Sequence, residues 1–311
     1  MEPHSSPRWG RAFLLTVGCV ACGARSKLGD VRFSADAAVP LEAATPADAA
    51  TPADAEAATA DSETATAWSP GMLGSRLAFW FDPTSMVQFD GYVTRWADLS
   101  GNGNDAIQAT TAYAPLYTAV GIDGLPSATF TGPITFFAVA DSATMQWGMG
   151  DFVVLGVARA AVGTAADGML YAKVGPYPWD GVNLYVNADK PGPTSRAAAQ
   201  VSGTLYVVST PPPYTFVDST VHLLGARRSG ATLEVRVDGV VSTSMTSDSI
   251  ATVDVSAVGW QAVIGQNGYA PTPEFQQIQG DVAEMLGVQG SVTPSELAEL
   301  EQYLKGRYAI P

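Results

Sequence analysis

The chain has 311 residues, of which only 15% are Asp, Glu, Lys or Arg, against about 25% in an average globular protein. This low fraction of charged residues excludes a coiled coil, a histone-like binder and a highly charged linker protein. Because 30 acidic residues outweigh 16 basic ones, giving a formal net charge of −14, a long polyanion would be repelled and we expect no nucleic-acid partner. Both cysteines, Cys19 and Cys22, lie near the N-terminus, which removes disulfides, cysteine-ligated zinc and thiol catalysis from everything after them.

A basic segment and a short apolar run open the chain. Arg8 and Arg11 precede the run 12–21, which is shorter than the about 20 residues that a membrane-spanning helix needs. The pattern is typical of a secretory signal peptide, residues 1–22. The small residue before each cysteine resembles the lipobox of bacterial lipoproteins, which implies a lipid on Cys22 or Cys19. The alternative is an ordinary signal peptide whose cysteines have no role.

Residues 23–70 have the composition of a tether. The pentad Thr-Pro-Ala-Asp-Ala occurs at 45–49 and again at 51–55, and large apolar residues are too few to offset the entropy lost on ordering. Between residues 33 and 70 there are seven acidic residues and no basic one, so self-repulsion extends the segment. We expect secretion across the inner membrane and, with a lipid, anchoring in the outer membrane or at the cell surface.

From residue 71 onward the sequence predicts strands. Five Asp-Gly and two Asn-Gly pairs, the strongest short hairpin signals, all lie in this part. In the hairpin at 232–243, Leu233, Val235 and Val237 alternate with polar residues, which gives one buried and one solvated face. Further strands are predicted at 77–81, 93–96, 128–131, 152–158, 169–173, 182–186, 205–209, 221–226, 262–265 and 280–288. About a dozen strands fit one all-β domain at 71–311, a two-sheet antiparallel jelly-roll sandwich.

One short helix is predicted at the C-terminus. The sequence from Thr293 to Glu296 is a capping box with proline at the first helical position. Leu297, Leu300 and Leu304 then recur on one helical face. We expect this helix to pack against the sandwich and to end near Gly306.

Several segments carry a family resemblance. Residues 77–83 (LAFWFDP), 93–106 (VTRWADLSGNGNDA) and 121–130 (GIDGLPSATF) resemble the opening of a laminin-G-like jelly roll of the concanavalin A-like lectin/glucanase superfamily. Residues 280–286 (GDVAEML) and 303–310 (YLKGRYAI) are similar to the last strand and helix of its bacterial members. The resemblance covers nearly all of 75–311. It implies the fold, but the superfamily includes lectins, adhesion modules, glycosidases and domains without a known ligand.

Residues for catalysis are scarce. Glucanases of the superfamily use Glu-x-Asp-x-Glu on one strand, and residues 71–311 contain no such motif. The nearest acidic pair is Asp281 and Glu284, which a spacing of three on a regular strand places on opposite faces, so we interpret Glu284 as structural. His222 is the only histidine after the signal and has no Gly-x-Ser-x-Gly motif to serve. We therefore predict a protein that is not an enzyme.

The loop at 98–105 has two interpretations. Asp98, Asn102, Asn104 and Asp105 place oxygen-bearing side chains around Gly103 as in the first half of an EF-hand loop, and the resemblance to lectin-like sandwiches also suggests calcium. Position 12 of that loop is Ala109, however, so the glutamate that completes an EF-hand is missing. The favoured alternative is a rigid turn without metal, in which these side chains bond their own backbone.

Loop aromatics are the candidate ligand-binding residues. Tyr177 and Trp179 lie between prolines in 175–181, which excludes a central strand and places them near the surface. Two more loops, 211–214 and 266–269, add further candidates: Tyr214, Asn267 and Tyr269. The alternative is that these side chains cover the ends of the sandwich. Trp80, Trp96 and Trp260 stand within strand patterns, and we expect them in the core.

The sequence thus predicts a non-catalytic cell-surface binding or adhesion module that recognises a glycan or a surface protein. We expect a monomer that touches the membrane only through a lipid anchor. Two alternatives remain open: a polysaccharide hydrolase or lyase with an unrecognised site, and a purely structural envelope component.

Overall fold

A computed structural model describes residues 68–132, 134–161, 168–176, 178–187, 196–208, 219–267 and 277–311. They belong to one compact unit, Thr64–Pro311. The expected signal peptide with Cys19 and Cys22, and the expected tether up to residue 67, lie outside the described residues. None of the helices in the described part is long and apolar enough to cross a bilayer.

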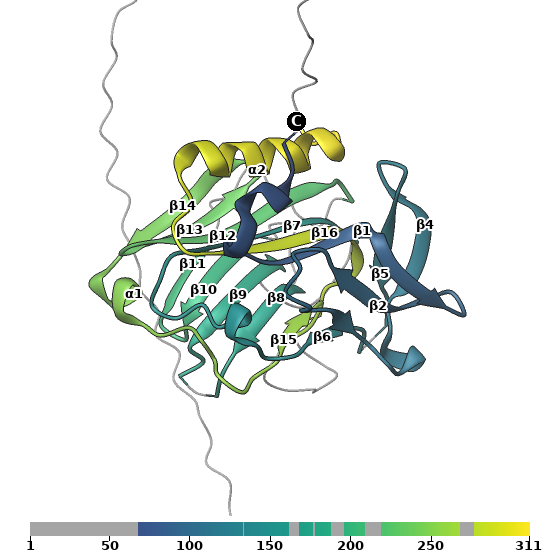
Figure 1. The fold of residues 1–311 in the computed structure, drawn as a ribbon, viewed down its shortest axis with the longest axis horizontal. Coiled ribbons are helices and arrows are strands. Elements are labelled where there is room, and N and C mark those ends of the chain that lie inside the picture. The colour runs from purple at the N-terminus through teal and green to yellow at the C-terminus, as the bar shows by residue number, and fades with distance from the viewer. Residues whose placement is uncertain are drawn as a thin grey trace, which may run out of the picture. The chain divides into compact units, whose positions relative to one another are not determined.

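The described residues are mostly β, with a helix near the C-terminus, as expected (Figure 1). Two α-helices, α1 (Asp248–Thr252) and α2 (Pro294–Arg307), and short 3-10 segments accompany the strands. The strands are β1 (Leu77–Phe89), β2 (Tyr92–Asp98), β3 (Ala106–Ile107), β4 (Leu116–Ile122), β5 (Leu125–Phe130), β6 (Phe137–Val139), β7 (Phe152–Ala160), β8 (Gly168–Val174), β9 (Gly181–Asn187), β10 (Ala198–Ser202), β11 (Leu205–Val208), β12 (His222–Ser229), β13 (Thr232–Val237), β14 (Val240–Thr246), β15 (Ala262–Ile264) and β16 (Gly280–Gln289).

Every predicted strand has a counterpart among these elements. The hairpin at 232–243 is β13 and β14, joined by an Asp238-Gly239 turn in which both residues have positive φ, 51° and 83°. Its Leu233, Val235 and Val237 are fully buried, as the alternation predicted. Four strands had no prediction, namely β3, β4, β6 and β10. Two of these have only two or three residues, β4 is largely solvent-exposed, and β10 is rich in alanine, so none carries a strong strand pattern.

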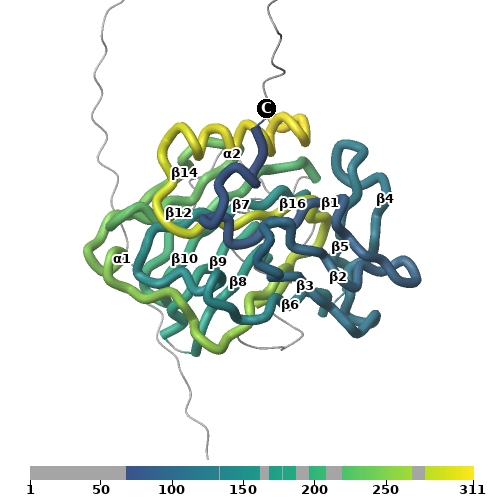
Figure 2. The backbone as a smooth tube through the Cα atoms, in the orientation of Figure 1, coloured from purple at the N-terminus to yellow at the C-terminus, as the bar shows by residue number. Residues whose placement is uncertain are grey.

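The strands form one continuous antiparallel ladder, in the order β11-β10-β9-β8-β15-β6-β3-β2-β4-β5-β16-β7-β12-β13-β14. At its two ends β10 and β11 lie against β12, β13 and β14, so the ladder closes into a barrel-like arrangement instead of two clearly separate sheets (Figure 2). The long strand β1 links two parts of this ladder, because its first half pairs with β16 and its second half pairs with β2. The register shifts between Phe81 and Met86, where the strand passes from one partner to the other.

Two clusters of buried apolar side chains stabilise this arrangement of strands. The larger fills the interior between the strands and includes Phe79, Trp96 and Leu184. The smaller lies on the outer side of β7 and β16, where helix α2 covers it with Leu297, Leu300 and Leu304. We estimate about 1.5 to 3 kcal/mol of stabilisation for each fully buried leucine side chain, so this face provides the main reason for α2 to dock.

The structure confirms the predicted C-terminal helix, which is α2, and its capping box. The Thr293 hydroxyl accepts from the Glu296 N–H at 3.2 Å, and the Glu296 carboxylate accepts from the Thr293 N–H at 2.9 Å. The helix ends at Arg307, one residue after the expected position.

Of the tryptophans expected in the core, Trp96 is fully buried and Trp80 packs beneath α2. Trp260 is half-buried just outside β15, so the core prediction was wrong for this residue.

Candidate functional site

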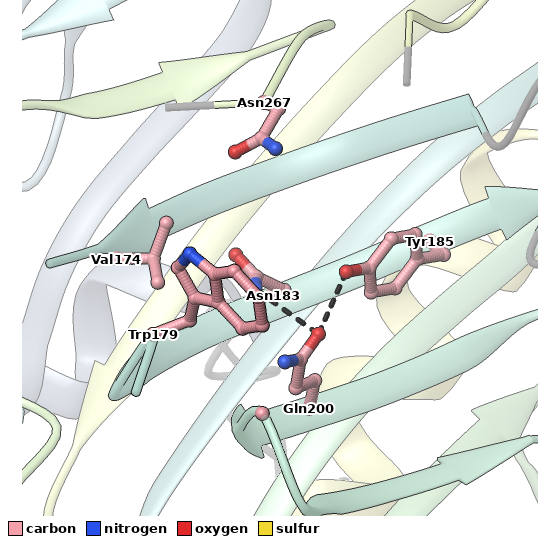
Figure 3. A pocket seen from close by; sticks show the side chains of 7 residues that line it. Val174, Trp179, Asn183, Tyr185, Gln200 and Asn267 are labelled. Atoms are coloured by element: carbon pink, nitrogen blue, oxygen red, sulfur yellow. Dashed lines mark hydrogen bonds between the residues drawn. The ribbon is translucent and has the colours of Figure 1, made fainter. Parts of the chain in front are cut away.

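A cavity of about 330 Å³ lies on the face of β8, β9 and β10 that is turned away from the core (Figure 3). Alternation along β9 creates this face, because Val182, Leu184 and Val186 enter the core while Asn183 and Tyr185 point outward. Its described lining residues are Val174, Trp179, Asn183, Tyr185, Gln200, Gly203 and Asn267.

Strand register places the amide groups of the cavity side by side. Asn183 on β9 is the direct partner of Gln200 on β10, and Gln200 is in turn the partner of Tyr206 on β11. Directly opposed residues of antiparallel strands present their side chains on one face. The half-exposed ring of Tyr206 therefore extends the polar row of the cavity by one strand.

A short loop holds Trp179 over the edge of the cavity. Its N–H donates to the Pro176 carbonyl at 2.9 Å, and its φ of 61° turns the chain back toward β9. Gly203, in the turn between β10 and β11, donates its N–H to the Pro178 carbonyl at 2.8 Å. A Cβ at 203 would lie 2.9 Å from the indole, so the ring rests on a glycine that nothing larger could replace without moving it. The loop is thus anchored while the indole stays 42% exposed.

The hydrogen bonds inside the cavity leave one acceptor unused. Oε1 of Gln200 accepts from the Tyr185 hydroxyl at 2.7 Å and from Nδ2 of Asn183 at 3.4 Å, as Figure 3 shows. Asn183 is only 3% exposed, and its Oδ1 has no hydrogen-bond donor within the described part of the chain. A buried polar atom without a partner costs free energy, and such atoms are rare in folded proteins.

The sequence-predicted ligand residues meet this cavity in part. Trp179 and Asn267 both line it, whereas Tyr177, Tyr214 and Tyr269 lie outside the described residues. Asn183, Tyr185 and Gln200 were not predicted as ligand residues, because they lie within strands, where side chains are expected to enter the core. The polar residues of 181–187 at every second position were the signal that could have revealed them.

The loop at 98–105 is closed by its own hydrogen bonds. Asp98 accepts from the N–H groups of Trp80, Ser100 and Asn104 and from the Ser100 hydroxyl, over 2.7 to 3.0 Å. Asp105 accepts from the Asp98 N–H at 2.9 Å and pairs with Arg95 at 2.7 Å. All four carboxylate oxygens are therefore engaged by protein donors.

The two asparagines of this loop also face inward to the protein. Nδ2 of Asn102 donates to the Leu77 carbonyl at 2.7 Å, and Nδ2 of Asn104 donates to the Ala78 carbonyl at 2.8 Å. Gly101 and Gly103 take φ values of 89° and 73°, which the turn requires. This is the geometry of the metal-free alternative. In the described residues no three His, Cys, Asp or Glu side chains form a group suited to a metal, and calcium binding stays a prediction.

The acidic pair Asp281 and Glu284 lies on one face of β16, contrary to the expectation of opposite faces. A bulge between Val282 and Glu284 inserts one residue and shifts the alternation. Val282 and Met285 consequently enter the larger core cluster, while Ala283 and Leu286 join the smaller one.

Even on one face the two carboxylates have separate partners. Asp281 pairs with Arg159, with 3.0 Å between its oxygen and Nε. Glu284 is fully buried and accepts from Nε1 of Trp80 at 2.7 Å and from the Tyr308 hydroxyl at 2.8 Å. Burial raises the pKa of Glu284 to about 7, although Arg307 at 3.3 Å and these two donors oppose the shift. Glu284 thus ties β16 to β1 and to the end of α2, which supports its structural interpretation.

His222 forms a similar tie at the start of β12. Its Nδ1 lies 2.9 Å from Oδ2 of Asp238, and its Nε2 lies 2.6 Å from the Thr220 hydroxyl. The second oxygen of Asp238 accepts from the Leu223 N–H at 2.9 Å. The histidine therefore fastens β12 to the turn between β13 and β14.

Comparison with known proteins gives the fold alone. No protein-family model matches the chain, and no curated protein matches it. The binding domain of Paraclostridial Mosquitocidal Protein 1 is similar with a TM-score of 0.54 at 10% identity, over 75% of this chain and 53% of that domain. Domain 4 of AbnA, a GH43 extracellular arabinanase from Geobacillus stearothermophilus, was solved in complex with arabinotriose. It is similar with a TM-score of 0.51 at 15% identity, over 73% of this chain and 98% of that domain.

These neighbours are β-rich domains like the described part of this chain. The match spans about half the length of the mosquitocidal protein's binding domain and nearly all of the arabinanase domain. At such low identity the likeness transfers no individual residue, so the cavity must be interpreted from its own side chains.

Proposed function

We propose that this chain is a non-catalytic cell-surface binding module and that its ligand is a glycan held at the cavity on β8, β9 and β10. The observation that carries the proposal is the exposed indole of Trp179, fixed beside the buried amide of Asn183 and the partly buried amide of Gln200. A sugar has apolar ring faces that pack on an aromatic plane and hydroxyls that exchange hydrogen bonds with amides. The cavity offers both chemistries within one space.

The structural neighbours support this proposal. One of them is named as a binding domain, and the other was solved with a bound oligosaccharide. The sequence resemblance supports a finer assignment of the fold, a laminin-G-like jelly roll of the concanavalin A-like superfamily whose two layers β1 joins.

The absence of catalysis is part of the proposal. The only acidic pair that the sequence singled out, Asp281 and Glu284, is held by Arg159, Trp80, Tyr308 and Arg307. Retaining glycosidases instead need two carboxylates about 5 to 5.5 Å apart that face a substrate. If the chain released reducing ends from a panel of glucans and galactans, the hydrolase alternative would replace this proposal.

The cellular location is proposed from the N-terminal sequence. We propose that the signal within residues 1–22 is cleaved directly before Cys22 or Cys19, that this cysteine becomes the lipidated N-terminus, and that the tether at 23–70 displays the domain at the cell surface. The intact mass of the mature protein from membranes tests this. Acyl chains on an N-terminal cysteine are expected, and an unmodified mature chain that starts elsewhere contradicts the anchor.

A glycan array probed with the full chain tests the binding function. We expect binding to a restricted set of saccharides, at least tenfold weaker in Trp179→Ala, because a central aromatic contact commonly provides 2 kcal/mol or more, by a rough estimate. Phe89→Ala is the matched control, since Phe89 is 67% exposed on the β1–β2 hairpin and does not line the cavity. Binding to no saccharide, or equal binding by Trp179→Ala, would overturn the glycan proposal. Capture of a defined surface protein at the same cavity would favour that partner instead.

A further inference from the structure

The described side chains that line the cavity carry no formal charge. They are an indole, a phenol, two asparagine amides, a glutamine amide and a valine, together with a glycine. Lys173, the one cation on β8, is fully buried and pairs instead with Asp141 at 2.7 Å. Any ligand therefore meets hydrogen-bonding dipoles and an aromatic surface, and no described cation balances a negative charge there.

Oδ1 of Asn183 is a hydrogen-bond acceptor that a ligand could use. It is buried and has no donor among the residues that the structure describes, while its neighbour Oε1 of Gln200 already accepts two hydrogen bonds. A buried acceptor that has no donor, in a residue that lines a cavity, is satisfied when a ligand hydroxyl displaces its surroundings and donates to it. A carboxylate would bring only acceptors to this position and would lose its hydration without a compensating cation.

Asn104 shows that the unpaired state is not a general property of buried asparagines in this fold. It is 4% exposed, close to the value for Asn183. Its Nδ2 donates to the Ala78 carbonyl and to the Thr144 hydroxyl, both at 2.8 Å, and its Oδ1 accepts from the Ser142 hydroxyl at 2.7 Å. The fold therefore satisfies one buried amide fully and leaves the oxygen of the other without a donor from the described residues.

We infer that the cavity selects uncharged sugars over anionic ones, and that Asn183 determines this selectivity by accepting a hydrogen bond from a sugar hydroxyl. The inference rests on the proposed glycan-binding function and adds the class of sugar and the residue that recognises it. Trp179 supplies the stacking surface in this arrangement, and Asn183 supplies the buried polar contact.

Matched neutral and acidic saccharides test the selectivity. The probes are lactose against 3′-sialyllactose, and fully methyl-esterified trigalacturonate against trigalacturonate, with arabinotriose as a further neutral sugar. Isothermal titration of the full chain is expected to give at least tenfold weaker binding of the acidic member wherever the neutral one binds. Equal or tighter binding of an acidic sugar overturns the inference alone. Binding of no saccharide on the probes or the array overturns the proposed function and the inference with it.

Substitution of Asn183 tests the role of its acceptor. We expect Asn183→Leu to bind the neutral sugar at least tenfold more weakly, equivalent to 1.4 kcal/mol, with no fall in its thermal midpoint, because the substitution removes an unpaired buried oxygen. The matched control Asn104→Leu, which removes a fully bonded amide, is expected to lower the midpoint and leave the affinity unchanged. Asn183→Ala separates steric blocking by leucine from loss of the acceptor and is expected to lose the same affinity. Wild-type affinity in both Asn183 variants overturns the assignment.

Discussion

The loop at 98–105 and the cavity on β8 to β10 are built from similar side chains and use them differently. In the loop, Asp98 accepts four hydrogen bonds and Asn104 makes three, so its polar groups are bonded within the protein. In the cavity, Oδ1 of Asn183 is buried without a donor from the described residues, beside a partly exposed indole. Polar composition alone therefore does not identify a site, whereas unused hydrogen-bonding capacity in a concave region does.

Removing Asp98 is expected to have the largest effect and to separate the two regions. Asp98→Ala leaves the N–H groups of Trp80, Ser100 and Asn104 without their acceptor, which we estimate to lower the free energy of unfolding by about 3 to 4 kcal/mol. Chemical denaturation measures this, and the saccharide affinity of the folded variant should stay within twofold of the wild type. Glu299→Ala, at an exposed position of α2, is the control. A variant of normal stability would show that the loop is not held by these bonds.

Glu284 belongs to a second cluster whose polar groups are bonded within the protein. Burial there disfavours the charged form of its carboxyl group. Since the pKa of Glu284 in the folded protein is about 7, above the ordinary glutamate value of 4.5, the folded state binds the proton more tightly than the unfolded state. The stabilisation is therefore complete below the unfolded pKa and is lost as the pH rises from about 4.5 to about 7, on the order of 3 kcal/mol.

Glu284→Gln is expected to lack this part of the decline, because glutamine does not titrate. Denaturant unfolding of both proteins between pH 4 and 8 measures the difference. The neighbouring charges of Arg307 and Asp82 are present in both, so they serve as the internal reference. Identical pH slopes in the two proteins would contradict the raised pKa.

Tyr206 tests how far the open region extends along the strands. Its ring is 51% exposed and lies opposite Gln200, but it does not line the cavity. Tyr206→Ala is expected to weaken oligosaccharide binding about threefold, since residues around a binding centre contribute less than central ones. Tyr206→Phe should bind as the wild type does. If Tyr206→Ala weakened binding as strongly as Trp179→Ala, the centre of the site would lie nearer to β11.

Calcium is expected to have the smallest effect. A site filled at about 100 times its Kd would add about 2.7 kcal/mol to the free energy of unfolding. Because the carboxylate oxygens of Asp98 and Asp105 already accept protein hydrogen bonds, we expect no such gain. Thermal unfolding of the full chain with calcium and with a chelator should give the same midpoint. A rise of several degrees with calcium, abolished in Asp98→Asn, would restore the calcium interpretation.

The fold could be predicted to the extent that its signals are local in sequence. The Asp-Gly turns at 90, 123 and 238, the alternation in β13 and the capping box at Thr293 each depend on a few adjacent residues, and the structure confirms them. The link that β1 makes between two parts of the ladder depends on a register shift, where the strand exchanges β16 for β2. The bulge at Val282 likewise reverses a face that regular alternation assigns to Glu284. Irregularities of this kind follow from tertiary pairing and have no short sequence pattern.

The candidate site could be predicted only at its loops. Prolines around Trp179 and the turn signal after Asn267 marked both as surface residues, and both line the cavity. Asn183 and Gln200 come from two strands, and only strand register places them together. That pairing is not visible in the sequence because the connection between the strands gives no register signal.

The central claim is that a saccharide binds at Trp179 and Asn183. The most direct test is a ¹H–¹⁵N NMR titration of the full chain with the neutral saccharide that binds most tightly on the array. The Trp179→Phe variant identifies the indole signal of Trp179 among those of the seven tryptophans. We predict that this signal and the side-chain amide signals of Asn183 and Gln200 shift on binding, while those of buried Trp96 and Trp147 stay in place. Saturable binding that leaves the Trp179 and Asn183 signals unchanged would contradict the account.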